Sequence, residues 1–218
     1  MARKFDLLVF DWDGTLLDST GAIVDSLKAA CRDLNLPEPS TRDARHVIGL
    51  GLGEALHLAV PSLAKEQIPW MIERYRHHYL SCDHDLMLFD GVLELIAELK
   101  ASDYLLAVAT GKSRLGLGRS LLHCGLGDYF SATRCADECF SKPHPQMLHE
   151  LMDEFSVSPE RMLMIGDTTH DLQMAINAGV SGLAVAYGAH SAEALDSLYP
   201  LARLDTLDEL ARWLHKYA

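Results

Sequence analysis

The stretch FDLLVFDWDGT, residues 5–15, joins an apolar run to two aspartates and a glycine. An apolar run without alternation is typical of a strand buried on both faces, as in a parallel sheet covered by helices. Asp11 and Asp13 lie two positions apart, so both carboxylates can face the same side where the strand opens into a turn at Gly14. Taken alone, Asp-Gly-Thr is more often a turn and helix cap than a reactive site.

Similar apolar runs recur further along the chain, each followed by a turn. The later runs are residues 104–109 before Thr110, residues 162–165 before Gly166-Asp167, and residues 182–187. Strands alternating with helical patterns predict an α/β fold with a Rossmann-like parallel sheet. Open parallel sheets bind ligands at the carboxyl ends of their strands, so we expect Asp11, Thr110 and Asp167 to meet at one edge.

Residues 18–88 follow a different pattern, because their apolar residues recur at intervals of three and four. The pattern predicts helices near 20–34, 43–47, 52–60 and 66–80. About seventy residues of helical pattern between two strands are more than an ordinary crossover needs. We therefore expect an α/β core made of residues 1–17 and 89–218, with an inserted helical cap at residues 18–88.

The composition is that of a globular protein with a strong acidic balance. The 218 residues are 49% hydrophobic and 23% charged, and 19 basic against 31 acidic side chains give a formal net charge of −12. This balance disfavours nucleic acid and anionic membrane surfaces as partners. An anionic substrate would therefore need local positive charge from a metal ion, a lysine or helix ends.

The cysteines and the apolar segments indicate a cytoplasmic protein. Five cysteines, an odd number, include no Cys-x-x-Cys pair. Asp6 interrupts the apolar start that a signal peptide would need. Residues 172–192 lack charged side chains, but their polar and glycine residues argue against a membrane span.

A second acidic pair points to a metal ion. Asp167 and Asp171 lie four positions apart in GDTTHD, residues 166–171. Carboxylates that converge without a cation repel and raise one another's pKa values. Mg²⁺ relieves that cost, because it binds one or two carboxylates and shares its shell with waters and substrate phosphate. The sequence therefore predicts a Mg²⁺ site that draws on Asp11, Asp13, Asp167 and Asp171.

Two further features suit a phosphate group. The prolines of SKPHP, residues 141–145, fix the backbone and can direct Lys142 inward. Thr110-Gly111 places a hydroxyl and a backbone amide after a strand. Each is more often an ordinary surface lysine or helix cap. Together with the carboxylates they supply a nucleophile, an acid, phosphate donors and metal ligands.

Four motifs in this order resemble those of the haloacid dehalogenase superfamily, specifically its phosphoglycolate-phosphatase-like branch. They are DWDGTL at 11–16, TGK at 110–112, KPHP at 142–145 and GDTTHD at 166–171, and AINAG at 175–179 continues the likeness. The resemblance spans most of the chain. It implies a mobile cap that closes over the substrate and excludes water.

The resemblance also implies roles for single residues. Asp11 attacks phosphorus to form an aspartyl-phosphate, and Asp13 protonates the leaving alcohol and later deprotonates water. Thr110, Gly111 and Lys142 hold phosphate oxygens. The ligands of Mg²⁺ are the Asp11 carboxylate, the Asp13 backbone carbonyl and Asp167, with Asp171 in the inner or the second shell.

Several alternatives stay open within this reading. We expect a small-molecule phosphate ester as substrate, with phosphoglycolate as the leading candidate, and Arg45 is a candidate contact for its carboxylate or a second phosphate. A sugar phosphomutase of the beta-phosphoglucomutase type would be expected to have a histidine where Ile23 stands. A pyrophosphatase or a non-catalytic phosphate-binding regulator would share every core residue. The oligomeric state is open, since the helical pattern from Leu207 to Leu214 suits packing on the sheet or on another subunit.

Overall fold

The computed structural model describes residues 3–218 and centres on a six-stranded parallel sheet. The strands lie in the order β3-β2-β1-β4-β5-β6. Their bounds are β1 (Leu7–Phe10), β2 (Leu105–Thr110), β3 (Ala132–Cys135), β4 (Met162–Gly166), β5 (Ser181–Val185) and β6 (Arg203–Leu204). The predicted α/β fold with a parallel sheet is confirmed.

Strand β1 lies at the centre of the sheet and brings the candidate residues together. Phe10 is in register with Val108 of β2 on one side and with Ile165 of β4 on the other. The three strands therefore end side by side. The polar residues that follow them leave the same edge of the sheet, as expected.

The pattern of apolar runs did not predict the two outer strands, β3 and β6. β3 has the sequence ATRC and is mostly half-buried, and β6 is only two residues long. Edge strands are covered on fewer sides and tend to be short and polar, so they lack the apolar run that marks a central strand.

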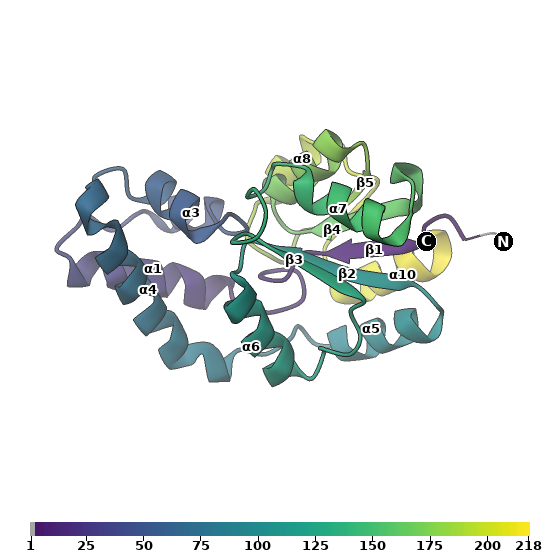
Figure 1. Cartoon of the computed structure of the whole chain (residues 1–218), viewed down its shortest axis with the longest axis horizontal. Coiled ribbons are helices and arrows are strands. Elements are labelled where there is room, and N and C mark those ends of the chain that lie inside the picture. The colour runs from purple at the N-terminus through teal and green to yellow at the C-terminus, as the bar shows by residue number, and fades with distance from the viewer. Residues whose placement is uncertain (1–2) are drawn as a thin grey trace.

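Helices cover both faces of the sheet (Figure 1). They are α5 (Val92–Ala101), α6 (Arg114–Cys124), α7 (Gln146–Phe155), α8 (Thr169–Ala178), α9 (Ala192–Asp196), α10 (Leu207–Tyr217) and the short 3₁₀ turn η3 (Pro159–Arg161). Leu8 and Phe10 of β1 share a hydrophobic cluster with α5 and α10, whereas Leu7 and Val9 share another with α7 and α8. Alternate residues of β1 thus serve opposite faces, and α10 packs on the core.

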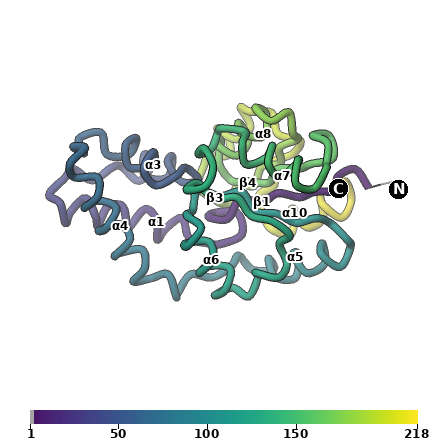
Figure 2. Tube along the Cα trace, viewed as in Figure 1, coloured from purple at the N-terminus to yellow at the C-terminus, as the bar shows by residue number. Residues whose placement is uncertain are grey.

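The helices between β1 and α5 form a separate lobe, which we call the cap (Figure 2). Its apolar residues share a hydrophobic cluster that also takes in Ala189 of the core. Its helices are α1 (Thr20–Asp33), α2 (Thr41–His46), α3 (Leu52–Ala59) and α4 (Ile68–Cys82), with 3₁₀ turns η1 (Lys65–Gln67) and η2 (Asp83–Asp85). α1 and α4 pack along each other.

The chain enters and leaves the cap through two adjacent segments. The Asp18 N–H donates to the Met87 carbonyl at 3.0 Å, and the Phe89 N–H donates to the Leu16 carbonyl at 3.0 Å. This pairing is where we propose that the cap, residues 18–88, joins the core. Within residues 3–218, no helix is both long and apolar enough to cross a membrane.

Candidate active site

Asp11 follows β1 directly and shares a buried lysine with a second carboxylate. The Lys142 Nζ lies 2.6 Å from Asp11 Oδ1 and 2.6 Å from Asp171 Oδ1, and all three side chains are buried. Burial opposes the charge of Lys142, but the carboxylates of Asp11 and Asp171 outweigh it and raise the pKa of the lysine. Lys142 is therefore positively charged at neutral pH.

One oxygen of Asp11 is left without a partner. Among the buried side-chain nitrogen and oxygen atoms of residues 3–218, Asp11 Oδ2 is the one that makes no hydrogen bond. An unpaired buried carboxylate oxygen is costly unless it meets a ligand. This oxygen is thus free to bind a cation or to attack an electrophile.

Asp167 and Asp171 are held by the loops around them. Asp167, which follows β4, accepts from the Thr15 hydroxyl at 2.7 Å and from the Ala189 N–H at 2.6 Å. Asp171 Oδ2 accepts from the hydroxyl of Thr168 at 2.6 Å and from its N–H at 3.1 Å, where Thr168 caps α8. The helix start therefore fixes the second acidic pair.

The three buried aspartates form an oxygen-rich cluster that fits Mg²⁺. Asp11, Asp167 and Asp171 each offer a carboxylate oxygen, and these atoms lie within 4.8 Å of one another. Burial, together with the charge of Asp171, raises the pKa of Asp11 well above its usual range and that of Asp167 to about 7. A hard divalent cation would reverse both shifts, because it favours ionised oxygen ligands.

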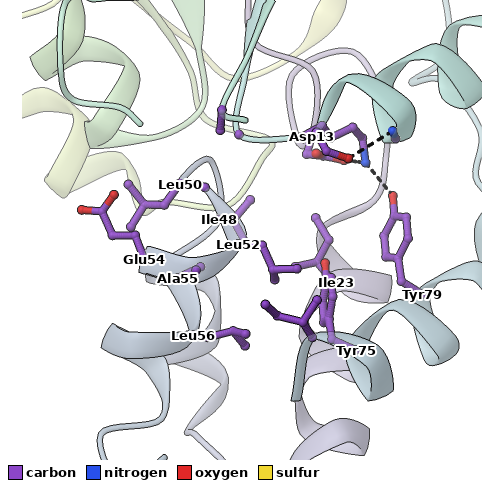
Figure 3. Close-up of a pocket in the computed structure, with 18 of the residues that line it drawn as sticks. Asp13, Ile23, Ile48, Leu50, Leu52, Glu54, Ala55, Leu56, Tyr75 and Tyr79 are labelled. Carbon is purple, nitrogen blue, oxygen red and sulfur yellow. Dashed lines mark hydrogen bonds and ion pairs between the residues drawn. The ribbon is translucent and has the colours of Figure 1, made fainter. Parts of the chain in front are cut away.

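The Asp13 carboxylate is not part of this cluster. Its Oδ1 accepts from the Ser19 hydroxyl at 2.6 Å and lies 2.9 Å from the Lys112 Nζ. The same ammonium donates to the Tyr79 hydroxyl of α4 at 2.9 Å (Figure 3). Tyr79 of the cap is thus linked through Lys112 to Asp13, the candidate general acid.

Lys112 and Tyr79 were not among the predicted site residues. Lys112 stands in the TGK motif directly after Gly111, so its position after a strand end was the available signal. Tyr79 carried no such signal, because it lies in α4, far from the core motifs along the chain.

Thr110 and Gly111 end β2 beside the cap. Thr110 is buried, and its hydroxyl oxygen accepts from the Lys112 N–H at 3.2 Å. A Cβ on Gly111 would lie 2.5 Å from the carbonyl oxygens of Gly49 and Leu50. The glycine-rich loop of the cap, residues 49–53, therefore lies directly on this strand end, which only a glycine permits.

Arg45 lies on α2 and connects the cap to the core. Its Nε donates to the Ala189 carbonyl at 3.0 Å, and its guanidinium also donates to the Gly188 carbonyl at 2.5 Å. Asp167 accepts from the N–H of the same Ala189. Arg45 is thus engaged with backbone carbonyls next to the acidic cluster, and its role in binding substrate stays a prediction.

A cavity of about 780 Å³ lies between the cap and the core. Asp13, Gly111 and Lys112 line it on the core side, and apolar residues of α1, α3 and α4 line it on the cap side. The glycine-rich loop also borders it.

Comparison with known proteins gives consistent matches over most of the chain. Residues 8–185 match the model of the family described as haloacid dehalogenase-like hydrolase. The probable phosphatase IndB of Dickeya dadantii (strain 3937) is 35% identical over 215 residues, which are 96% of this chain and 93% of that protein. The phosphoglycolate phosphatase of Vibrio vulnificus (strain CMCP6) is 30% identical over 217 residues, 95% of each chain.

A solved structure has the same fold throughout. The crystal structure of a predicted phosphoglycolate phosphatase from Haemophilus somnus 129PT superposes with a TM-score of 0.88 at 26% sequence identity. The match covers 97% of this chain and 99% of that one.

Proposed function

The chain belongs to the haloacid dehalogenase-like hydrolase family, and we propose that it is a Mg²⁺-dependent phosphatase of small organic phosphate monoesters. The observation that carries the proposal is the unpaired Asp11 Oδ2, buried beside the charged Lys142. A carboxylate nucleophile divides a difficult hydrolysis into two easier steps.

In the first step Asp11 Oδ2 attacks phosphorus, and the bond from phosphorus to the ester oxygen breaks. Asp13 donates its proton to the leaving oxygen, so an alcohol departs and an aspartyl-phosphate remains. In the second step Asp13 takes a proton from water, whose oxygen attacks phosphorus. Inorganic phosphate leaves and the Asp11 carboxylate is restored.

The neighbouring groups stabilise the charge of the transferred phosphoryl group. Lys142 brings a positive charge whose attraction for phosphate oxygens is stronger in a buried site than in water, and we assign the Thr110 hydroxyl and the Gly111 amide as donors to phosphate oxygens. The residues that would hold Mg²⁺ are Asp11, Asp167 and the Asp13 carbonyl, with Asp171 in the inner or second shell. When bound, Mg²⁺ supplies positive charge that neutralises the phosphoryl oxygens.

Phosphoglycolate is the first substrate to test, because the Vibrio vulnificus relative carries that name. The experiment measures phosphate release from phosphoglycolate, sugar phosphates, nucleoside monophosphates, pyrophosphate and an aryl phosphate, with Mg²⁺ and with chelator. Release that chelator abolishes supports the proposal.

The same panel separates the alternatives. Release from pyrophosphate alone would indicate a pyrophosphatase. Movement of a labelled phosphate between two positions of one sugar would indicate a phosphomutase. Phosphate binding by folded protein without turnover of any ester would indicate a regulatory protein and would contradict the proposal.

A further inference from the structure

We propose that the leaving group of the substrate is a bulky, mainly apolar body that carries an aromatic or heteroaromatic ring, held in the cavity between the cap and the core. The inference rests on the proposed function, because it takes Asp13 as the group that protonates the leaving oxygen. It goes further by naming the chemical class of that leaving group.

The position of Asp13 decides where a leaving group must go. Asp13 lies on the wall of the 780 Å³ cavity, whereas Asp11 and Lys142 are buried and do not border it. An ester oxygen at the Asp13 carboxylate therefore directs the remainder of the alcohol into the cavity. Its volume lies within the range of about 300–1,000 Å³ that is typical of small-molecule sites. A cavity of this size is larger than a two-carbon acid needs.

The wall opposite Asp13 is mainly apolar, although Glu54 of α3 also borders the cavity (Figure 3). Three cap helices contribute to it: Ile23 and Leu27 from α1, Leu52 and Leu56 from α3, and Ile72 and Tyr75 from α4. Such a wall favours an apolar body, because each square ångström of apolar surface removed from water contributes about 25 cal/mol. None of these six side chains carries a charge that would bind a short, charged alcohol.

Two tyrosines give this wall an aromatic face. The rings of Tyr75 and Tyr79, one turn apart on α4, stack with centroids 6.0 Å apart and an interplanar angle of 20°. Both side chains border the cavity. Aromatic faces bind planar rings by offset stacking or edge contacts, which is why we place a ring in the leaving group.

The charges on the wall argue against a small anionic leaving group. The Lys112 ammonium is already paired with Asp13, and Arg119 lies 3.6 Å from Asp83. Arg76 is exposed on α4, so water screens its charge. A carboxylate close to the reacting phosphate would thus meet cations that already contact other side chains or are exposed to solvent.

The test uses phosphate esters of primary alcohols, which differ little in intrinsic reactivity. The series is ethyl, butyl, 2-phenylethyl and 2-(indol-3-yl)ethyl phosphate, with phosphoglycolate and 4-nitrophenyl phosphate beside it. We expect kcat/KM to rise along the series, by roughly a hundredfold from ethyl to 2-phenylethyl phosphate. Phosphoglycolate should not exceed ethyl phosphate.

A cavity-filling variant tests whether this wall causes the preference for ring-bearing esters. Ala55 of α3 borders the cavity, so Ala55→Phe should lower kcat/KM for 2-phenylethyl phosphate by about tenfold or more while ethyl phosphate is spared. Leu58→Phe is the matched control, because Leu58 is exposed on the same helix. Should Ala55→Phe fail to fold, Leu52→Ser tests the same wall by making it polar.

The outcomes separate the two proposals. If kcat/KM for phosphoglycolate or ethyl phosphate equals that for the ring-bearing esters, the leaving-group inference is wrong and the phosphatase proposal stands. If folded protein with Mg²⁺ releases phosphate from none of these esters, including 4-nitrophenyl phosphate, the phosphatase proposal itself fails.

Discussion

The hydroxyl of Tyr79, from the cap, accepts a 2.9 Å hydrogen bond from the Lys112 ammonium, which lies 2.9 Å from the Asp13 carboxylate. The cap and the core therefore meet at Asp13 through this chain of contacts. We expect Tyr79 to act on Asp13 through Lys112, as a positioning residue.

Tyr79→Phe tests this role. A hydrogen bond to a charged group contributes about 1.5–3 kcal/mol, so we expect kcat to fall by roughly ten- to a hundredfold. KM should change little, since the ring that borders the cavity remains. Tyr75→Phe is the control, because the Tyr75 hydroxyl makes no hydrogen bond within residues 3–218. Equal effects of the two substitutions on kcat would contradict the role.

Asp11→Asn should abolish turnover while the fold is kept. Loss of a nucleophile typically costs about 10⁴–10⁶ in kcat. In metal-free protein the variant should be at least as stable as the wild type, because one of three crowded buried carboxylates becomes neutral. Phosphate release and thermal unfolding measure the two effects. Asp18→Asn, an exposed position in the same loop, is the control, and a wild-type rate in Asp11→Asn would disprove the assignment.

Lys142→Met should weaken both the fold and catalysis. It leaves Asp11 and Asp171 buried without their shared cation, and breaking a buried ion pair costs about 3–5 kcal/mol. Denaturant unfolding gives the free energy directly. Lys100→Met is a surface control, since Lys100 is exposed on α5. A free energy of unfolding equal to that of the control would mean that the buried pairs contribute nothing.

Gly111→Ala should push the cap loop off the core. The added Cβ would lie 2.5 Å from two backbone carbonyl oxygens, which cannot move aside as a side chain can. We expect kcat/KM to fall by about ten- to a hundredfold, because a misplacement of about 1 Å in a catalytic site has that scale of effect. Gly118→Ala in α6 meets open space and should leave activity unchanged. Unaltered kinetics in Gly111→Ala would show that loop contact to be dispensable.

Mg²⁺ should stabilise the protein more as the pH rises. Burial raises the pKa of Asp167 to about 7 in the folded protein, whereas the unfolded carboxyl titrates near its usual value of about 3.9. The metal-free folded state therefore keeps a proton that the unfolded state has lost, and this group's contribution to stability falls as the pH rises from about 4 to about 7.

The cation binds the ionised form and removes that penalty. Melting temperatures at pH 5, 6, 7 and 8, with Mg²⁺ and with chelator, should give a difference that grows from pH 5 to pH 7 and then levels off. A difference that is constant across this range would show that the aspartates do not release protons when the metal binds.

The motifs and the central strands could be predicted because their signals are local. The apolar run before Asp11 marks a strand that helices cover on both sides, and the recurrence of such runs indicates a parallel sheet. The strand-end rule then places Asp11, Thr110 and Asp167 at one edge without any coordinates. The helical spacing of residues 18–88 likewise indicated the cap helices, since burial of one helix face repeats every three or four residues.

Contacts between segments distant along the chain needed the tertiary structure. The strands β3 and β6 are short edge strands whose sequences lack a periodic signal. Arg45 and Tyr79 lie on cap helices, and the periodicity of these helices does not indicate which groups of the core the two side chains contact. Local periodicity records which face of an element is buried, whereas the packing of cap against core decides what that face meets. The sequence therefore indicated the reactive residues of the site, and only the packing of the cap against the core decided which side chains contact Asp13 and which residues line the cavity beside it.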